Sequence, residues 1–363
     1  MIYYLKIYIV YYKRMSEKIE INTKIYNHSE YNGKNLEKLE LLFSGKDINI
    51  KLINSLRRAC INGVPGYGFA RELIKIKENT TIGYNNDYMS LRLSHLPIFN
   101  VKNKKLNLDP NISYLHEKYW NNINFNDSDR LKVLDDKKQE IEKNIEMQIN
   151  VVNETNSELN VDTNNKNIKV YIENELVDMY DKKFPILIIK LKPKEKFNCY
   201  LKGVLSVGEK NNIFSNCTNS WHYYEDEEKE ENIILSIRSY GLLNVFDIYI
   251  RGCEYLLKRI SILRKIINTQ LKKIKIDVNS FLLELINEDN TIADLLNYEL
   301  QENKDILYSG ISIPDNLKKN INIKINCNEN LNQEKFIKII SNCFDNLEKK
   351  INKIHKNIIK LKK

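Results

Sequence analysis

Side chains that could bind a metal or transfer protons are scattered through this sequence of 363 residues. Its cysteines form no CxxC pair, the spacing expected of a zinc knuckle or a thioredoxin-type site. His95 and His222 have no second metal ligand at helical or loop spacing, so we expect structural histidines rather than a metal or acid–base role. The sequence therefore predicts no metal, no cofactor and free, mostly buried thiols in a reducing compartment. The six cysteines are Cys60, Cys199, Cys217, Cys253, Cys327 and Cys343.

Motifs for catalysis give no positive signal either. We find no glycine-rich phosphate loop and no serine or cysteine in the context of an activated nucleophile. A free-standing enzyme would need a convergent polar pocket, which the pattern of residues does not indicate. We therefore expect no catalytic residue in this chain.

The net charge of +9 leaves two interpretations open. Lysine and arginine pair with phosphates, so a basic chain could bind nucleic acid directly and act alone. The excess is diffuse, however, and much of it lies in lysine-rich stretches such as Lys349–Lys363, where a charge run is typical of the solvated face of a helix.

The first residues, Met1–Tyr12, are apolar and rich in tyrosine. The run is shorter than the roughly 20 residues that span a bilayer, and its basic residues Lys13 and Arg14 follow it rather than precede it. We interpret it as a short tail or an added strand and not as a membrane anchor. Met15 is an alternative start.

The next elements alternate between strand and helix. Apolar residues predict a strand at Leu36–Phe43, then a helix at Asp47–Ile61 with Asp47 as its N-cap and Gly63 as its end. A strand is expected at Leu73–Lys77. This order is typical of the α+β class.

A compositional change marks an insertion at 100–183, where Asn, Asp, Lys and Glu dominate. Sustained periodicity is absent there, so we expect an insert that is partly ordered at best. Continuous apolar runs at Phe184–Leu191 and Phe197–Val207 then predict buried strands. The acidic stretch Glu225–Glu231 is expected to be an exposed loop.

Two long amphipathic helices are predicted, at Asn244–Leu271 and at the end of the chain. Between them, Phe281–Ile286 and the alternating run Ile321–Cys327 predict strands, and Thr291–Gln301 predicts a helix. A small sheet with two helices therefore occurs twice. Each long helix has an apolar seam that one half alone could not cover, so we expect the halves to pack on each other.

Three segments carry a family resemblance. The first is DINIKLINSLRR at Asp47–Arg58, continuing to Val64-Pro65, and it resembles the N-terminal dimerisation helix of the bacterial RNA polymerase alpha subunit and of the third subunit of archaeal and eukaryotic polymerases. The second comprises IKENTT at Ile76–Thr81 and MSLRLSHLPI at Met89–Ile98, which resemble the Asn-Thr turn and following helix of the same family. The third, NEDNTIADLLNYEL at Asn287–Leu300, resembles the eleventh subunit of eukaryotic RNA polymerase II and its small archaeal partner.

The resemblance implies a third-subunit-like domain fused to an eleventh-subunit-like domain, as in large DNA viruses. The expected domains are a tail and lead-in at 1–35, a first dimerisation domain at 36–99 with 184–274, an insert at 100–183, and a second dimerisation domain at 275–363. The implied fold is α+β, with two alpha-like domains packed as an intramolecular heterodimer.

The function implied is a non-catalytic assembly platform of a DNA-directed RNA polymerase, in which partner subunits carry nucleotidyl transfer. The implied partners are the second-largest and largest subunits and small accessory subunits like the tenth and twelfth, with DNA contacted only through the complex and no membrane. A viral source would place the chain in the host cytoplasm, at the viral factory, and in the virion; a cellular source would place it in the nucleus.

The same resemblance implies roles for individual residues. Arg57 and Arg58 are expected to contact the large subunits, with an internal salt bridge as the alternative for one of them. Asn54 is expected to satisfy a buried backbone group, and Arg92 could do either. The expected dimer core consists of Leu256, Ile260, Leu263, Ile267, Leu295, Leu347, Ile351, Ile354 and Ile358.

An aromatic group, Trp221, Tyr223 and Tyr224, lies beside the acidic stretch. It could form a protein docking patch, and packing in the core or at its rim is the other interpretation.

Overall fold

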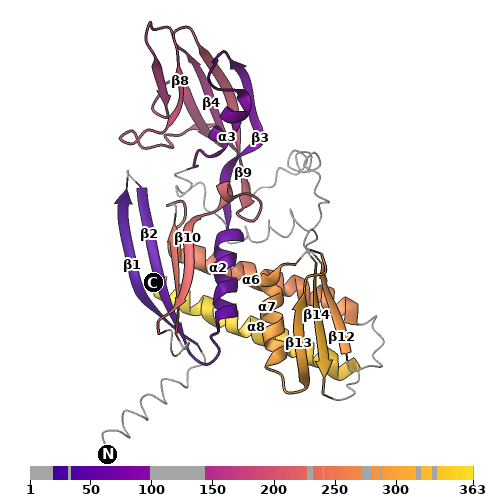
Figure 1. The fold of residues 1–363 in the computed structure, drawn as a ribbon. Helices are drawn as coiled ribbons and strands as arrows, with labels where there is room; N and C mark the ends of the chain where they lie inside the picture. The colour runs from indigo at the N-terminus through magenta and orange to yellow at the C-terminus, as the bar shows by residue number, and fades with distance from the viewer. Residues whose placement is uncertain are drawn as a thin grey trace, which may run out of the picture.

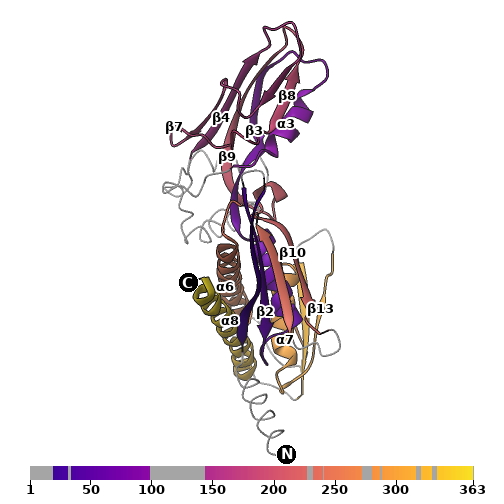
Figure 2. The ribbon, with the colours of Figure 1, turned by 90° about the vertical axis from the view of Figure 1, so that its left-hand side faces the viewer.

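A computed structural model gives the fold of the chain. It describes residues 19–31, 34–98, 144–226, 232–239, 241–271, 280–286, 288–315, 320–328 and 333–362. Figure 1 shows two bodies, one above the other, and the view in Figure 2 separates them in the same way. The predicted α+β class is confirmed, because small antiparallel sheets and helices make up both bodies.

The lower body contains two antiparallel sheets and four helices. One sheet has the strand order β1-β2-β11-β10, and the other has the order β12-β14-β13. Its strands are β1 (Glu20–Tyr31), β2 (Lys34–Ser44), β10 (Cys217–Tyr224), β11 (Ile233–Ser239), β12 (Ser280–Ile286), β13 (Ile306–Ser312) and β14 (Asn320–Cys327). Its helices are α2 (Ile50–Asn62), α6 (Val245–Leu271), α7 (Asn290–Gln301) and α8 (Gln333–Lys362).

Helix contacts join the two sheets of the lower body. Helix α2 packs against β10 and β11, and α7 packs against β13 and β14. The long helices cross between the sheets: α6 touches β2 and β11 as well as β12, and α8 reaches β1. Buried side chains from both halves therefore form one continuous hydrophobic cluster.

The upper body is a β-rich unit with its own core. Its larger sheet has the order β3-β9-β4-β6-β7, and β5 and β8 form a separate pair. The elements are β3 (Pro65–Asn79), α3 (Asn86–Ser94), β4 (Ile145–Val152), β5 (Leu159–Asp162), β6 (Ile168–Ile172), β7 (Glu175–Leu176), β8 (Leu187–Leu191) and β9 (Lys196–Val207), with a short 3₁₀ turn η1 (Asn212–Phe214) below them. Strands β3 and β9 are paired from Pro65–Val207 to Asn79–Phe197 and connect the two bodies (Figure 1).

The part of the expected insert that is described differs from the sequence prediction. Residues 145–152 form β4, whose buried and exposed side chains alternate at period two, and β6 pairs with it. Because Asn and Lys residues are frequent in this unit, its overall composition did not reveal the alternation. Residues 99–143 and 1–18 lie outside the described residues, and so do the expectations for them.

The expected domain borders also need correction. The strands expected at Leu73–Lys77, Phe184–Leu191 and Phe197–Val207 belong to the upper body and not to the first dimerisation sheet. That sheet instead takes β1 from the expected lead-in and the hairpin of β10 and β11. Helix α2 begins later than expected, because Asn49 and not Asp47 is its N-cap.

No helix in the described part of the chain is long and apolar enough to cross a membrane.

Candidate subunit interface

Helix α2 is held at both ends by its own sequence. The Asn49 side chain accepts a hydrogen bond from the Leu52 amide at 2.8 Å, which satisfies one of the free donors of the first turn. After the last turn, the Gly63 amide donates to the Ala59 carbonyl at 2.8 Å, and a Cβ at Gly63 would lie 2.5 Å from the Tyr255 ring. The helix therefore ends where it meets α6.

A second glycine sets the distance between α2 and α6. A Cβ at Gly252 would lie 2.6 Å from the Cys60 Sγ, closer than carbon and sulfur can approach. Glycine lowers the stability of a helix interior, so this position is explained by the close contact it permits. The contact fixes α2 on the first half of the lower body.

Helices α6 and α8 run antiparallel across the boundary between the halves. The Asp247 carboxylate near the start of α6 pairs with Lys362 near the end of α8. Farther along α6, Arg264 lies 2.8 Å from the Asp345 carboxylate and donates to the Ser341 hydroxyl at 2.9 Å. Polar pairs at both ends of the contact thus flank its apolar centre.

The N-terminus of α7 meets the first half at three polar contacts. The Ser55 hydroxyl of α2 donates to the Thr291 carbonyl at 2.8 Å in a buried position. Arg58 lies 3.2 Å from the carboxylate of Asp289, which is the N-cap of α7. These contacts orient the two short helices α2 and α7 relative to each other.

The third contact is the more buried of the two ion pairs. Arg259 of α6 lies 2.7 Å from the Glu288 carboxylate, and the two side chains are 17% and 7% exposed. Burial raises the pKa of the Glu288 carboxyl, while the charge of Arg259 counteracts part of this shift. Arg259 also lies over the Tyr255 ring, 5.8 Å from its centroid, so its guanidinium is enclosed by α6 and the start of α7.

The structure brings the nine predicted core residues together. Each is at most 2% exposed, and all belong to the one cluster that spans both halves. They come from α6, α7 and α8, which are in mutual contact. They are Leu256, Ile260, Leu263, Ile267, Leu295, Leu347, Ile351, Ile354 and Ile358.

The predicted contact residues have different surroundings. Arg58 forms the internal salt bridge that the sequence left open as an alternative, and Asn54 accepts a hydrogen bond from the Arg57 Nε at 3.0 Å instead of binding backbone. Burial, with repulsion from Arg58, lowers the pKa of the half-buried Arg57. Arg92 lies apart from them in the upper body and donates to the Leu187 carbonyl at 2.9 Å.

The aromatic group on β10 lies on both faces of its sheet. The ammonium of Lys38 lies 5.3 Å from the centroid of the Trp221 ring and 2.7 Å from the Glu40 carboxylate. Burial would raise the pKa of Glu40, but the hydrogen bond and charge of Lys38 outweigh it, and the pKa lies below its usual value. Tyr223 donates to the same carboxylate at 3.2 Å, so both aromatic residues belong to an internally paired network.

Metal-ligating side chains do not gather anywhere in the described residues, since no group of three or more His, Cys, Asp or Glu could hold an ion there. His222 packs near Arg57, and burial, together with that charge, lowers the pKa of His222, which disfavours its protonated form.

Sequence reasoning missed the polar pairs at the boundary. Arg259, Arg264 and Glu288 were not singled out, although the two arginines lie on α6 beside its apolar seam. The available signal was the position of the two arginines beside the apolar seam of a predicted interface helix. Their partners are distant in sequence, so spacing could not identify the pairs.

Comparison with known proteins gives three matches. Residues 280–357 match the RNA polymerase Rpb3/Rpb11 dimerisation domain. A putative DNA-directed RNA polymerase subunit of Acanthamoeba polyphaga mimivirus is 26% identical over 290 residues, which cover 76% of this chain and 78% of the viral protein. The DNA-directed RNA polymerase II subunit rpb11 of Dictyostelium discoideum is 32% identical over 74 residues, covering 19% of this chain and 62% of that protein.

These matches confirm the resemblance described from the sequence. The family match and the Dictyostelium relative correspond to one small domain, and the family match places it in the second half. The viral match is much longer than that half, so it includes much of the first half as well. Such coverage is expected of a chain in which two subunit types are fused.

Proposed function

We propose, from the match of residues 280–357 to the RNA polymerase Rpb3/Rpb11 dimerisation domain, that the chain is a non-catalytic platform on which a DNA-directed RNA polymerase assembles. The observation that carries the proposal is the single hydrophobic cluster shared by both halves. One chain thereby supplies a complete dimer, and fusion gives the halves a high effective concentration. Partner subunits would carry the nucleotidyl transfer.

The second-largest subunit is the partner we assign to the first half. Arg57 supports this assignment, because it is half-buried beside Arg58 and forms no ion pair with any described residue. A guanidinium in this position can bind a carboxylate or carbonyl of a partner. Arg58 and Asn54 would then orient α2, while Arg92 would act from the upper body.

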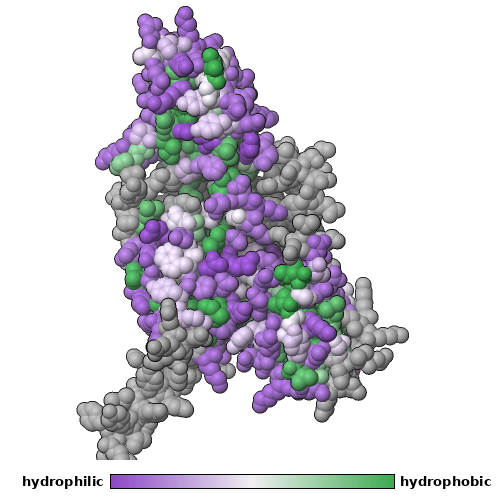
Figure 3. All heavy atoms as spheres, in the orientation of Figure 1, coloured by the Kyte–Doolittle hydropathy of each residue, from purple (hydrophilic) through white to green (hydrophobic). Residues whose placement is uncertain are grey.

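The largest subunit, or a small accessory subunit, is the partner we assign to the second half. Figure 3 shows hydrophobic side chains over the sheet of β12, β13 and β14. Leu282, Leu307 and Tyr308 are 56%, 71% and 55% exposed. Exposed apolar groups gathered on one sheet are typical of a protein interaction surface. In a viral setting the assembly would take place in the host cytoplasm and enter the virion.

Co-expression with the second-largest subunit tests the proposal. We expect Arg57→Glu to reduce the amount of captured subunit at least about tenfold, because a charge reversal replaces a favourable ion pair with repulsion. Lys265→Glu, an exposed change of the same charge on α6, is the matched control and should leave capture unchanged. Equal capture by both variants, with unchanged melting temperatures, would refute the assignment of Arg57.

The alternative is a basic protein that binds nucleic acid on its own, as the net charge of +9 allows. Titrating the purified chain with duplex DNA at several salt concentrations separates the two functions. A platform should bind weakly, whereas a stand-alone binder should show tight binding with a steep dependence on salt concentration.

A further inference from the structure

The two halves place their short helices in equivalent positions. Helix α2 packs on α6 and α7 packs on α8, and each short helix begins at a polar N-cap, Asn49 or Asp289. The start of α7 contacts α6 through Glu288 and Arg259, and the start of α2 lines a cleft together with α8, so each short helix begins at the long helix of the other half. The lower body therefore contains two related junctions.

The junction at the start of α7 is closed by a carboxylate. Glu288, the residue before the N-cap, reaches the Arg259 guanidinium of α6 at 2.7 Å and is 6% exposed. The residue before the other N-cap is Ile48, which cannot supply a charge and packs against the hydrophobic cluster. Position 48 therefore supplies no carboxylate to α8, the long helix of the other half.

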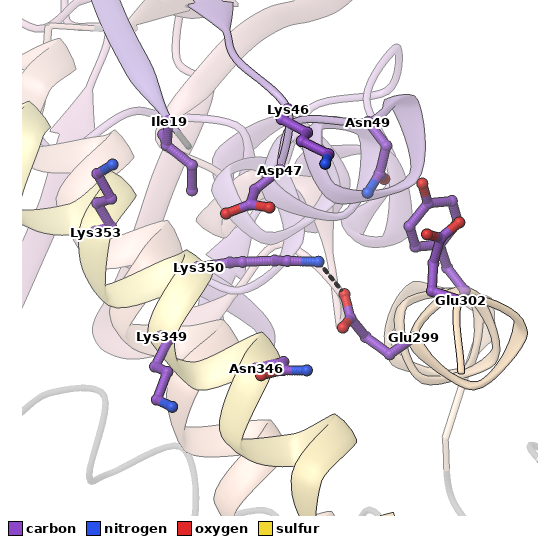
Figure 4. A pocket seen from close by; sticks show the side chains of 11 residues that line it. Ile19, Lys46, Asp47, Asn49, Glu299, Glu302, Asn346, Lys349, Lys350 and Lys353 are labelled. Carbon is purple, nitrogen blue, oxygen red and sulfur yellow. Dashed lines mark hydrogen bonds and ion pairs between the residues drawn. The ribbon is translucent and has the colours of Figure 1, made fainter. Parts of the chain in front are cut away.

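An open cleft of about 390 Å³ lies at this second junction. The loop before α2 forms one wall with Lys46 and Asp47, α8 forms another with Lys349, Lys350 and Lys353, and α7 closes the far side. Figure 4 shows Lys350 extending across the cleft to Glu299 of α7, with Lys353, Asp47 and Lys46 above it in this view and Lys349 below it.

The lysines of the cleft are only partly neutralised. Lys350 forms an ion pair with Glu299. Among the described residues, Lys46, Lys349 and Lys353 form no ion pair with a carboxylate. Asp47, Glu299 and Glu302 also line the cleft, so four lysines from two elements outnumber three carboxylates there.

We propose that this cleft binds an acidic segment of a partner protein, whose carboxylate takes the place that Glu288 occupies at the other junction. The proposal does not depend on which polymerase subunit carries the segment. A nucleic acid is the other polyanion that these lysines would attract, and the competition experiment below separates the two occupants. The volume accommodates a few side chains of a peptide.

Binding of a fluorescent hexaglutamate peptide to the full chain at low ionic strength tests the proposal. The cleft variant carries Lys349→Glu and Lys353→Glu, and it leaves Lys350 in place because Lys350 holds Glu299. We expect its affinity for the peptide to fall about tenfold, since two attractive charges become repulsive. The control carries Lys338→Glu and Lys360→Glu, two exposed residues of α8 outside the cleft, and should bind within about twofold of the parent.

Other outcomes would overturn the proposal. Equal weakening in both variants would mean that the peptide responds to the net charge and not to the cleft. Undetectable binding to the parent chain would exclude the site. A single-stranded heptanucleotide, which carries six phosphates, should displace the hexaglutamate peptide poorly. If the heptanucleotide binds the parent chain more tightly than the peptide does, and the cleft variant loses this binding, the cleft is assigned to nucleic acid. Circular dichroism spectra of both variants verify that they are folded.

Discussion

Arg259 of α6 and Glu288, the residue before the N-cap of α7, lie 2.7 Å apart across the boundary between the two halves. Both side chains are largely removed from water. A buried ion pair adds little net stability, because desolvation of the two charges offsets their attraction. Its larger effect is on how the two halves align, since an incorrect alignment would leave one charge buried without a partner.

Removing only one member of this pair should therefore be costly. We expect Arg259→Met to lower the free energy of unfolding by ~3–5 kcal/mol, because Glu288 would stay buried and unpaired. Combining it with Glu288→Leu should recover most of the loss. Urea denaturation of the two single variants and the double variant gives the coupling energy. Additive losses would show that the two side chains act independently.

Ile351 in the apolar seam of α8 is the position for a test of the shared core. Its side chain is 1% exposed, so Ile351→Asp buries a charge that has no partner, and we expect a loss of more than about 3 kcal/mol. The neighbouring Asn352 is exposed, and Asn352→Asp adds the same charge there as a control. Thermal unfolding should show a lower midpoint for the whole chain in the first variant only. An unchanged midpoint in Ile351→Asp would refute the intramolecular dimer.

The contact of Gly252 with Cys60 predicts non-additive substitutions. Gly252→Ala should destabilise the chain by about 1–3 kcal/mol, because the new methyl group would overlap the Cys60 Sγ. Cys60→Ala alone leaves a small cavity, and the double variant should cost less than the sum of the two. Gly83, where a Cβ meets nothing within 4 Å, provides the control position for an alanine. The urea concentration at the midpoint of unfolding is measured for all four variants and compared with that of the parent chain.

The six cysteines are buried and free. Burial raises the pKa of the Cys217 and Cys343 thiols to about 12, so at pH 8 only about one in ten thousand of each is ionised. We expect iodoacetamide to modify no cysteine of the folded chain within minutes, and all six in urea. Mass spectrometry counts the adducts. Rapid labelling of one thiol in the native chain would mean that its part of the core opens readily.

Periodicity predicted the long helices and the second half well. In α6 and α8 the buried residues recur every three or four positions over several turns, and in β14 they alternate strictly from Ile321 to Cys327. These patterns are strong because each element has one face in the shared core and one in water. The end of α2 at Gly63 was also predictable, since glycine commonly ends helices.

Other features could not be inferred from local sequence. Strand β1 is an edge strand, and among its described side chains, those up to residue 27, most are exposed and Ile19 and Ile21 near its start are buried. The alternation in β4 was present but lay within a segment whose overall composition predicted an insert that is partly ordered at best. The pairing of Arg58 with Asp289 joins residues 231 positions apart, and no spacing rule predicts such a contact.

Helix α8, at 333–362, packs on β1, which begins at Glu20. A nascent chain therefore has its first sheet, with α6 against β2 and β11, well before the helix that covers β1. Until the last of these thirty residues has left the ribosome, the apolar side of the growing protein needs protection by chaperones or by rapid posttranslational folding. A premature stop codon anywhere before α8 should consequently yield an insoluble product and not a shortened, working one.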